Sequence, residues 1–197
     1  MDLYLVPDNP EHTILVSCNG VAHYKIRTVG RPKVSILQRP ADCEEESIVA
    51  EIEWRHWDSP SKIRSPLFGM HVAGVLLDSF LFRKRRFGHS RYFVGNDGLE
   101  YKWKLEKGLG LVLTQVDTLK EIAHYSRGFV EEGLFAHEKR AMLRIQPSSL
   151  DIDLIILSFL IFAKKRRDRG GDGTKLTAHD DDPQGDGGFS GAEVGDT

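Results

Sequence analysis

The chain has 197 residues, of which 40% are hydrophobic and 28% charged, and its formal net charge at pH 7 is -2. This length supplies one sizeable core or at most two small ones, and so weak a charge argues against a dedicated nucleic-acid-binding protein. The two cysteines, Cys18 and Cys43, exclude a disulfide framework and lack the CxxC spacing of a zinc site.

The charge is unevenly distributed along the chain. Residues 170–197 contain seven acidic side chains and one lysine, a net charge of -6, which leaves +4 on residues 1–169. The acidic segment is rich in glycine and aspartate, so we expect a disordered tail after a folded domain at 1–169. The N-terminal residues lack the basic and apolar regions of a secretory signal, which favours a cytoplasmic location.

Strands and turns dominate the chain before residue 147. Residues 12–18 and 21–27 form a predicted hairpin around Asn19-Gly20, the dipeptide preferred in type I′ turns. Apolar and charged residues alternate from Ile48 to Trp54, as in a half-buried strand. Leu76–Phe82 is too short for periodicity to distinguish helix from strand. Further strands are expected within 33–37, 64–75, 90–94, 100–105, 109–115, 121–126 and 139–146.

A helix is predicted at about 149–167, with Ser149 as its N-cap. Its segment Ile152–Ala163 is apolar on nearly every side but spans well under the ~30 Å hydrocarbon core of a membrane. A buried helix after a β-rich chain predicts a mainly β fold: a closed antiparallel β-barrel, about 1–146, with this helix through it. The residues expected to face inward are Ile14, Val16, Ile52, Trp54, Tyr101, Trp103, Leu154, Ile155, Leu157, Phe159 and Ile161.

A family resemblance rests on Leu3–Leu5, Pro7–Pro10, Ala50–Trp54, Arg91–Leu105 and Leu150–Phe159 with the basic end. These segments resemble a fungal family of domains of unknown function with the tubby-like barrel fold. That fold class includes tubby C-terminal domains, phospholipid scramblases and plant LURP-one-related proteins. The resemblance implies contact with membrane lipid, because tubby domains bind phosphoinositides and scramblases act at membranes. No tubby phosphoinositide motif maps onto this chain, so the resemblance transfers no binding residue.

Two basic clusters are the candidate lipid-binding site. The first is flanked by Phe80, Leu81, Phe82 and Phe87, and each of its cations would contribute about 1 kcal/mol near an anionic bilayer. Two alternatives stand beside this hypothesis: a solvated loop between core elements and a nuclear localisation signal. The second cluster also complements the dipole of the predicted helix. The candidate residues are Arg83, Lys84, Arg85 and Arg86, and Lys164, Lys165, Arg166 and Arg167.

Enzymatic motifs are weak, and we predict no catalytic residue, no metal site and no cofactor. His56, Asp58 and Ser59 contain the residue types of a catalytic triad, but neighbours along a strand point to opposite faces. Glu51 and Glu53 share a strand face, which is more typical of a solvated surface than of a carboxylate pair.

The sequence therefore predicts a non-catalytic binding module that docks peripherally on anionic, phosphoinositide-like membrane lipid through a basic surface. The alternative is a soluble protein-interaction scaffold whose acidic tail contacts a basic partner. Neither hypothesis requires nucleic acid or a membrane-spanning segment. The first places the protein in the cytoplasm at the periphery of a membrane, and the basic run leaves nuclear import as an alternative.

Overall fold

A computed structural model describes residues 1–40, 47–55, 60–69, 74–85 and 88–170. Twelve strands form one sheet in the order β7-β6-β5-β4-β3-β2-β1-β12-β11-β10-β9-β8, and all the pairings are antiparallel. The strands are β1 (Asp2–Val6), β2 (Thr13–Val16), β3 (Ala22–Val29), β4 (Lys33–Gln38), β5 (Ile48–Trp54), β6 (Lys62–Arg64), β7 (Val75–Leu76), β8 (Arg91–Val94), β9 (Glu100–Glu106), β10 (Gly110–Gln115), β11 (Glu121–Phe129) and β12 (Lys139–Ile145). The helices are η1 (Pro66–Phe68), α2 (Leu77–Phe80) and α3 (Ile152–Gly170).

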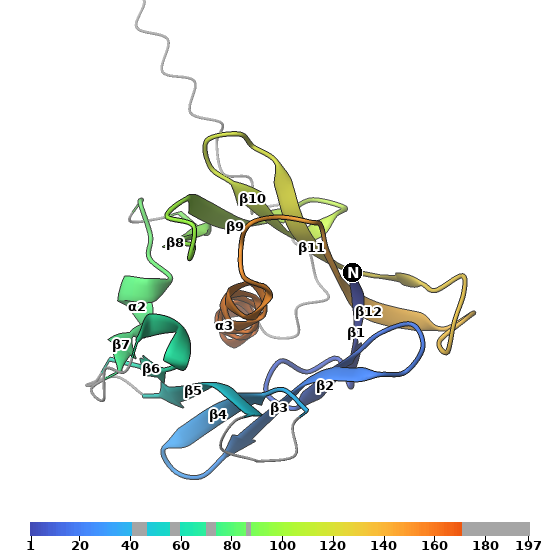
Figure 1. Cartoon of the computed structure of the whole chain (residues 1–197), viewed down its shortest axis with the longest axis horizontal. Helices are drawn as coiled ribbons and strands as arrows, with labels where there is room; N and C mark the ends of the chain where they lie inside the picture. Colours follow the sequence, from blue (N-terminus) through green and yellow to red (C-terminus); the bar gives the residue numbers. More distant parts are fainter. Residues whose placement is uncertain (41–46, 56–59, 70–73, 86–87, 171–197) are drawn as a thin grey trace, which may run out of the picture.

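The sheet curves around α3, which Figure 1 shows nearly end-on at the centre of the molecule. The side chains of Ile155, Ile156, Leu157, Phe159 and Ile161 are completely buried. A helix that is apolar on every side has no face for solvent, so it needs packing partners all round. The inward side chains of the curved sheet supply them, and the predicted buried helix is confirmed.

The prediction of a closed barrel is wrong. The outermost strands are β7 and β8, and no ladder joins them within the described part of the chain. The chain leaves β7 after two residues and turns into α2, and an isolated bridge between Phe82 and Tyr92 then reaches β8. We call this interval between the two edge strands the open seam. Leu77, Phe80 and Leu81 belong to the same core as α3, so apolar side chains fill the seam where strand pairing ends.

The start of α3 also differs from expectation. Asp151 is the N-cap, because its Oδ1 accepts a hydrogen bond from the backbone N–H of Asp153 at 2.8 Å. Ser149, the predicted cap, instead donates to Asp97 Oδ2 at 2.5 Å. The Asp153 carboxylate is buried and accepts hydrogen bonds from Tyr24 Oη at 2.7 Å and Arg39 Nε at 3.0 Å. These bonds tie the first turn of α3 to β3 and to the end of β4.

The predicted core is correct except in β2. Leu15 is completely buried, whereas Ile14 is 38% exposed and Val16 lies on the outer face. Val16 packs there against a small second cluster built by Tyr4, Val130 and Phe135. Because a shift of one residue exchanges the two faces of a strand, a strand with apolar residues on both faces does not reveal which face is internal.

One buried polar contact fixes α3 against the sheet. Trp103 Nε1 donates to Ser158 Oγ at 2.9 Å, and this hydroxyl donates to the carbonyl of Ile155 at 3.0 Å. The Trp103 ring also lies against the rings of Phe159 and Phe162. The indole N–H therefore has its partner inside the core.

Replacing Ser158 by alanine should lower the free energy of unfolding by about 1–3 kcal/mol, because it leaves the buried indole N–H without an acceptor. Chemical denaturation measures this change. The matched control is Ser148→Ala, which removes the hydroxyl of an exposed serine and should change stability by less than about 0.5 kcal/mol. Equal effects of the two substitutions would contradict the assigned hydrogen bond.

Candidate functional site

The first predicted basic cluster is divided between exposed and paired side chains. Arg83 and Arg85 are exposed. Lys84 donates to Glu100 Oε2 at 2.5 Å, and its ammonium lies 4.8 Å from the centre of the Tyr92 ring. Arg86 lies outside the described residues. All three described cations are therefore exposed, but the ammonium of Lys84 is already paired and held against the outer face of the sheet.

The second cluster separates into internal and external residues. Lys164 is only 6% exposed and donates to Asp168 Oδ2 at 2.9 Å, with Glu11 Oε1 at 3.2 Å. Burial raises the pKa of Glu11, but the hydrogen bond and charge of Lys164 outweigh burial and leave that pKa below its ordinary value. Lys165 is paired with Asp78 of α2. Lys164 thus serves the structure and is not available to a ligand.

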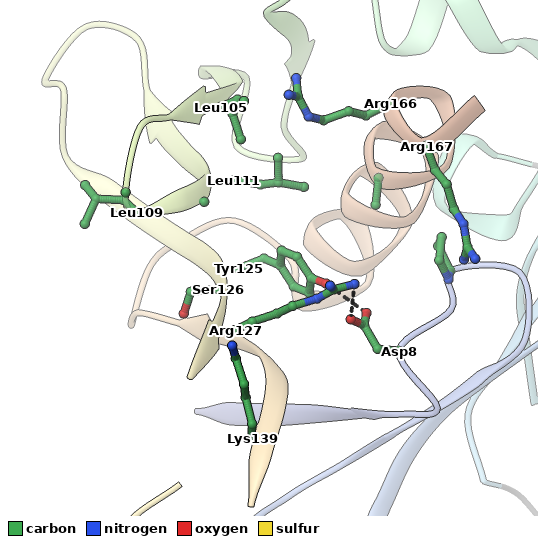
Figure 2. A pocket seen from close by; sticks show the side chains of 14 residues that line it. Asp8, Leu105, Leu109, Leu111, Tyr125, Ser126, Arg127, Lys139, Arg166 and Arg167 are labelled. Atoms are coloured by element: carbon green, nitrogen blue, oxygen red, sulfur yellow. Dashed lines mark hydrogen bonds and ion pairs between the residues drawn. The ribbon is translucent and has the colours of Figure 1, made fainter. Parts of the chain in front are cut away.

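Arg166 and Arg167 line a pocket of about 360 Å³ beside the C-terminal end of α3. Figure 2 shows these two side chains extending from α3, with Arg127 and Lys139 coming from the neighbouring strands. We call this cavity the basic pocket. It is lined by Asp8, Pro10, Leu105, Gly108, Leu109, Gly110, Leu111, Tyr125, Ser126, Arg127, Lys139, Ala163, Arg166 and Arg167.

A hydrogen-bonded group forms one side of the basic pocket. Tyr125 Oη donates to Asp8 Oδ1 at 2.8 Å, and Arg127 Nη2 is 2.5 Å from Asp8 Oδ2 (Figure 2). Burial and the charge of Asp8 raise the pKa of Tyr125 well above its ordinary value. Burial lowers the pKa of Arg127, but its interactions with Tyr125 and Asp8 prevail and raise it. Both the hydroxyl and the guanidinium therefore stay protonated at neutral pH.

The opposite side of the basic pocket is apolar. Leu105, Leu109 and Leu111 lie along the β9–β10 hairpin, and Leu109 at its turn is 52% exposed. Gly110 allows this hairpin to approach β11 closely: its φ is +107°, and a Cβ atom there would lie 2.1 Å from the carbonyl oxygen of Tyr125. An apolar wall therefore faces a cationic one.

The pocket is electropositive as well as amphipathic. Its described lining contains four cationic side chains and a single carboxylate, Asp8. Such a lining suits an anion with an apolar portion.

In the part of the chain that the structure describes, no group of three or more His, Cys, Asp and Glu residues could hold a metal ion. The triad candidates His56, Asp58 and Ser59 lie outside the described residues.

The two basic clusters approach each other at the open seam. The isolated antiparallel bridge pairs Phe82 with Tyr92, and their chain neighbours Arg83 and Arg91 are therefore close together at the seam. The charges of Arg83 and Arg169 act on Arg91, and that of Arg91 acts on Lys165. We call Arg83, Arg91, Lys165 and Arg169 the seam cluster.

Sequence reasoning missed three cations at this end of the molecule: Arg91, Arg127 and Lys139. Arg91 is paired with Trp103 in the β8–β9 ladder, so the alternation of that hairpin placed it on the inner face. Arg127 and Lys139 are isolated in the sequence, and only the β11–β12 pairing brings them to one pocket.

Comparison with protein families matches residues 8–168 to a family of unknown function, DUF6593. The chain belongs to this family. The prediction of a domain-of-unknown-function family is confirmed, while its fungal origin and tubby-like relationship stay predictions. Comparisons with curated proteins and with solved structures find no match.

Within the described residues, no helix is both long and apolar enough to cross a bilayer.

The Tyr125 hydroxyl should make stability depend on alkaline pH. The unfolded chain ionises this tyrosine near pH 10, whereas the folded chain retains its proton to higher pH. Above about pH 10 the unfolded state therefore binds fewer protons than the folded state. The stabilisation that the protonated Tyr125 contributes is complete below about pH 10 and is lost as pH rises. Tyr125→Phe should make the decline of the unfolding free energy shallower by up to about 1.4 kcal/mol per pH unit.

Urea denaturation between about pH 9 and 11, across the ordinary tyrosine pKa, measures this slope. Ser126→Ala changes the next residue of β11 without removing a titratable group, and it should keep the wild-type slope. An unchanged slope in Tyr125→Phe would refute the raised pKa.

Proposed function

We propose that this DUF6593 domain is a non-catalytic module that binds anionic, phosphoinositide-like membrane lipid peripherally. The observation that carries the proposal is the basic pocket, where a leucine wall with the exposed Leu109 faces four cationic side chains. Cations beside an exposed apolar edge are the usual composition of an interfacial binding surface. The ligand would place its anionic group among the arginines and its apolar part against the leucines.

The position of the basic pocket favours a surface encounter. Arg167 and Lys139 are exposed, and Arg167 Nη1 donates to Asn9 Oδ1 at 2.9 Å, which holds the guanidinium at the pocket. Each cation near an anionic bilayer contributes about 1 kcal/mol. Two such contributions, with partial insertion of Leu109, would give weak and salt-sensitive binding, as expected of a peripheral protein.

The predicted basic clusters enter this proposal unequally. Arg166 and Arg167 contribute to the basic pocket, and the exposed Arg83 and Arg85 widen the cationic surface beyond it. Lys164 is left out, because it is buried and paired inside the domain. The predicted relationship to tubby-like domains and a fungal origin remain part of the proposal, and the lipid contact common in that class supports the same ligand.

The alternative is a protein-interaction scaffold in which the acidic tail contacts a basic partner. Its support is the net charge of -6 on residues 170–197, which lie outside the described residues except for Gly170. This alternative needs no lipid, so vesicle binding separates the two hypotheses. Deletion of the tail would then test whether it recruits the partner.

Neutralising Lys139 and Arg167 together should weaken binding to anionic vesicles roughly thirtyfold, since two charges contribute about 1 kcal/mol each. Co-sedimentation of the full chain measures this with phosphatidylcholine vesicles that contain phosphatidylserine or a phosphoinositide, at low and moderate salt. The variant is Lys139→Gln/Arg167→Gln.

The charge-matched control is Lys25→Gln/Lys120→Gln. Lys25 is exposed on β3, and Lys120 lies before β11 at the end of the sheet opposite the basic pocket, where its Nζ donates to the carbonyl of Pro147. This control should bind like the wild type. Equal losses of vesicle binding in both variants would show that binding depends on net charge and not on the basic pocket. An absence of vesicle binding in the wild type would favour the scaffold.

A further inference from the structure

A buried arginine stands at the open seam. Arg91 is only 1% exposed, in the same core layer as its ladder partner Trp103. Its Nη1 donates to the carbonyl of Ser90 at 3.0 Å and makes two longer contacts of 3.4 Å with the carbonyls of Gly88 and His89. Its Nε is buried and has no hydrogen-bond partner among the described residues. A buried charged donor without a partner is costly, so this group calls for an acceptor.

The surroundings of Arg91 are cationic instead of acidic. Arg83 follows the Phe82–Tyr92 bridge and its charge acts on Arg91, while Lys165 and Arg169 lie one helical turn apart on α3 and interact with the same region. Among the described residues, the carboxylate that acts on Arg91 is that of Asp78. That carboxylate is 84% exposed and already hydrogen-bonded to Lys165. Four cations and one carboxylate leave a net formal charge of +3.

This charge persists at neutral pH. Burial, then Arg83 and Arg169, lower the pKa of Arg91 to about 10, while Asp78 opposes them. Burial also lowers the pKa of Arg169, with Arg83 acting in the same direction. The negative end of the α3 dipole stabilises the positive charges of Lys165 and Arg169 and so accounts for cations at these positions. It does not explain why β8 places a third, inward-facing cation beside them.

We propose that the seam cluster binds a phosphate group, either a free phosphomonoester or the monoester of a lipid headgroup. A guanidinium offers paired N–H donors that match phosphate oxygens, and charge-assisted bonds of this kind are the strong ones. A phosphate dianion would balance most of the +3 charge and supply an acceptor for Arg91 Nε. The seam cluster shares no residue with the basic pocket and requires no membrane, so this inference goes beyond the proposed function.

The test is the thermal unfolding of the full chain in sodium phosphate against sodium chloride at constant ionic strength, with inositol trisphosphate as a second probe. A ligand that binds the folded state raises the melting temperature saturably. We expect such a rise for the wild type. Arg83→Gln/Arg169→Gln should reduce the affinity at least roughly tenfold, the loss of one charge-assisted contact or more.

Both Arg83 and Arg169 are exposed, so their substitution should preserve the fold, which circular dichroism checks. Two further variants make the test specific. Arg91→Lys keeps the buried charge but removes the guanidinium, and it should weaken phosphate binding as well. Lys25→Gln/Lys120→Gln, which neutralises two exposed cations outside both the seam cluster and the basic pocket, should bind phosphate as the wild type does and thereby separates a specific site from net charge.

The source of the phosphate follows from two arms of the experiment. Saturable binding of inositol trisphosphate that does not require vesicles supports the site with a soluble ligand. Binding only to vesicles that carry phosphatidylinositol bisphosphate, lost both in Arg83→Gln/Arg169→Gln and in the charge-preserving Arg91→Lys, supports it with a lipid ligand. Absence of phosphate-specific binding in both arms, or wild-type affinity in that double variant, would overturn the inference.

Discussion

The burial of α3 is the constraint on which the rest of the structure depends. From Leu154 to Phe162 the helix offers no side to water, because every one of these residues is buried. A flat sheet would cover one side of such a helix and leave the other exposed. The antiparallel sheet instead curves around it, and where β7 and β8 fail to pair, the apolar residues of α2 continue the enclosure (Figure 1). The Trp103–Ser158 and Tyr24–Asp153 hydrogen bonds then fix the helix in the enclosure.

Enclosure of α3 also decides where ligands can reach the molecule. The interior is occupied by helix side chains, so binding must take place at the rim. The C-terminal end of α3 is cationic, and cations are favoured there by the helix dipole. The basic pocket lies on one flank of that end and the seam cluster on another. Both candidate sites therefore follow from the same helix terminus and from the way the sheet surrounds it.

Basic residues that look alike in the sequence take different parts in the structure. The buried Lys164 is ion-paired with Glu11 and Asp168, while Arg167 reaches the basic pocket three residues later. Residues three apart on an α-helix lie on nearly the same face, so this difference comes from their partners: Lys164 is held by Glu11 and Asp168, and Arg167 by Asn9. Lys84 is likewise paired with Glu100, whereas Arg83 remains exposed at the seam. The net charge of a cluster is thus a poor measure of what it offers to a ligand.

The sequence by itself determined the features that depend on local periodicity and turn chemistry: the Asn19-Gly20 hairpin, the alternation of β5, the helix and its burial. It also indicated the two basic clusters. Only the tertiary structure decided that the sheet stays open, that Leu15 and not Ile14 faces the core, and that Arg91, Arg127 and Lys139 join the candidate sites. These features depend on pairing between distant strands and on side chains meeting across the chain, which local sequence patterns do not encode.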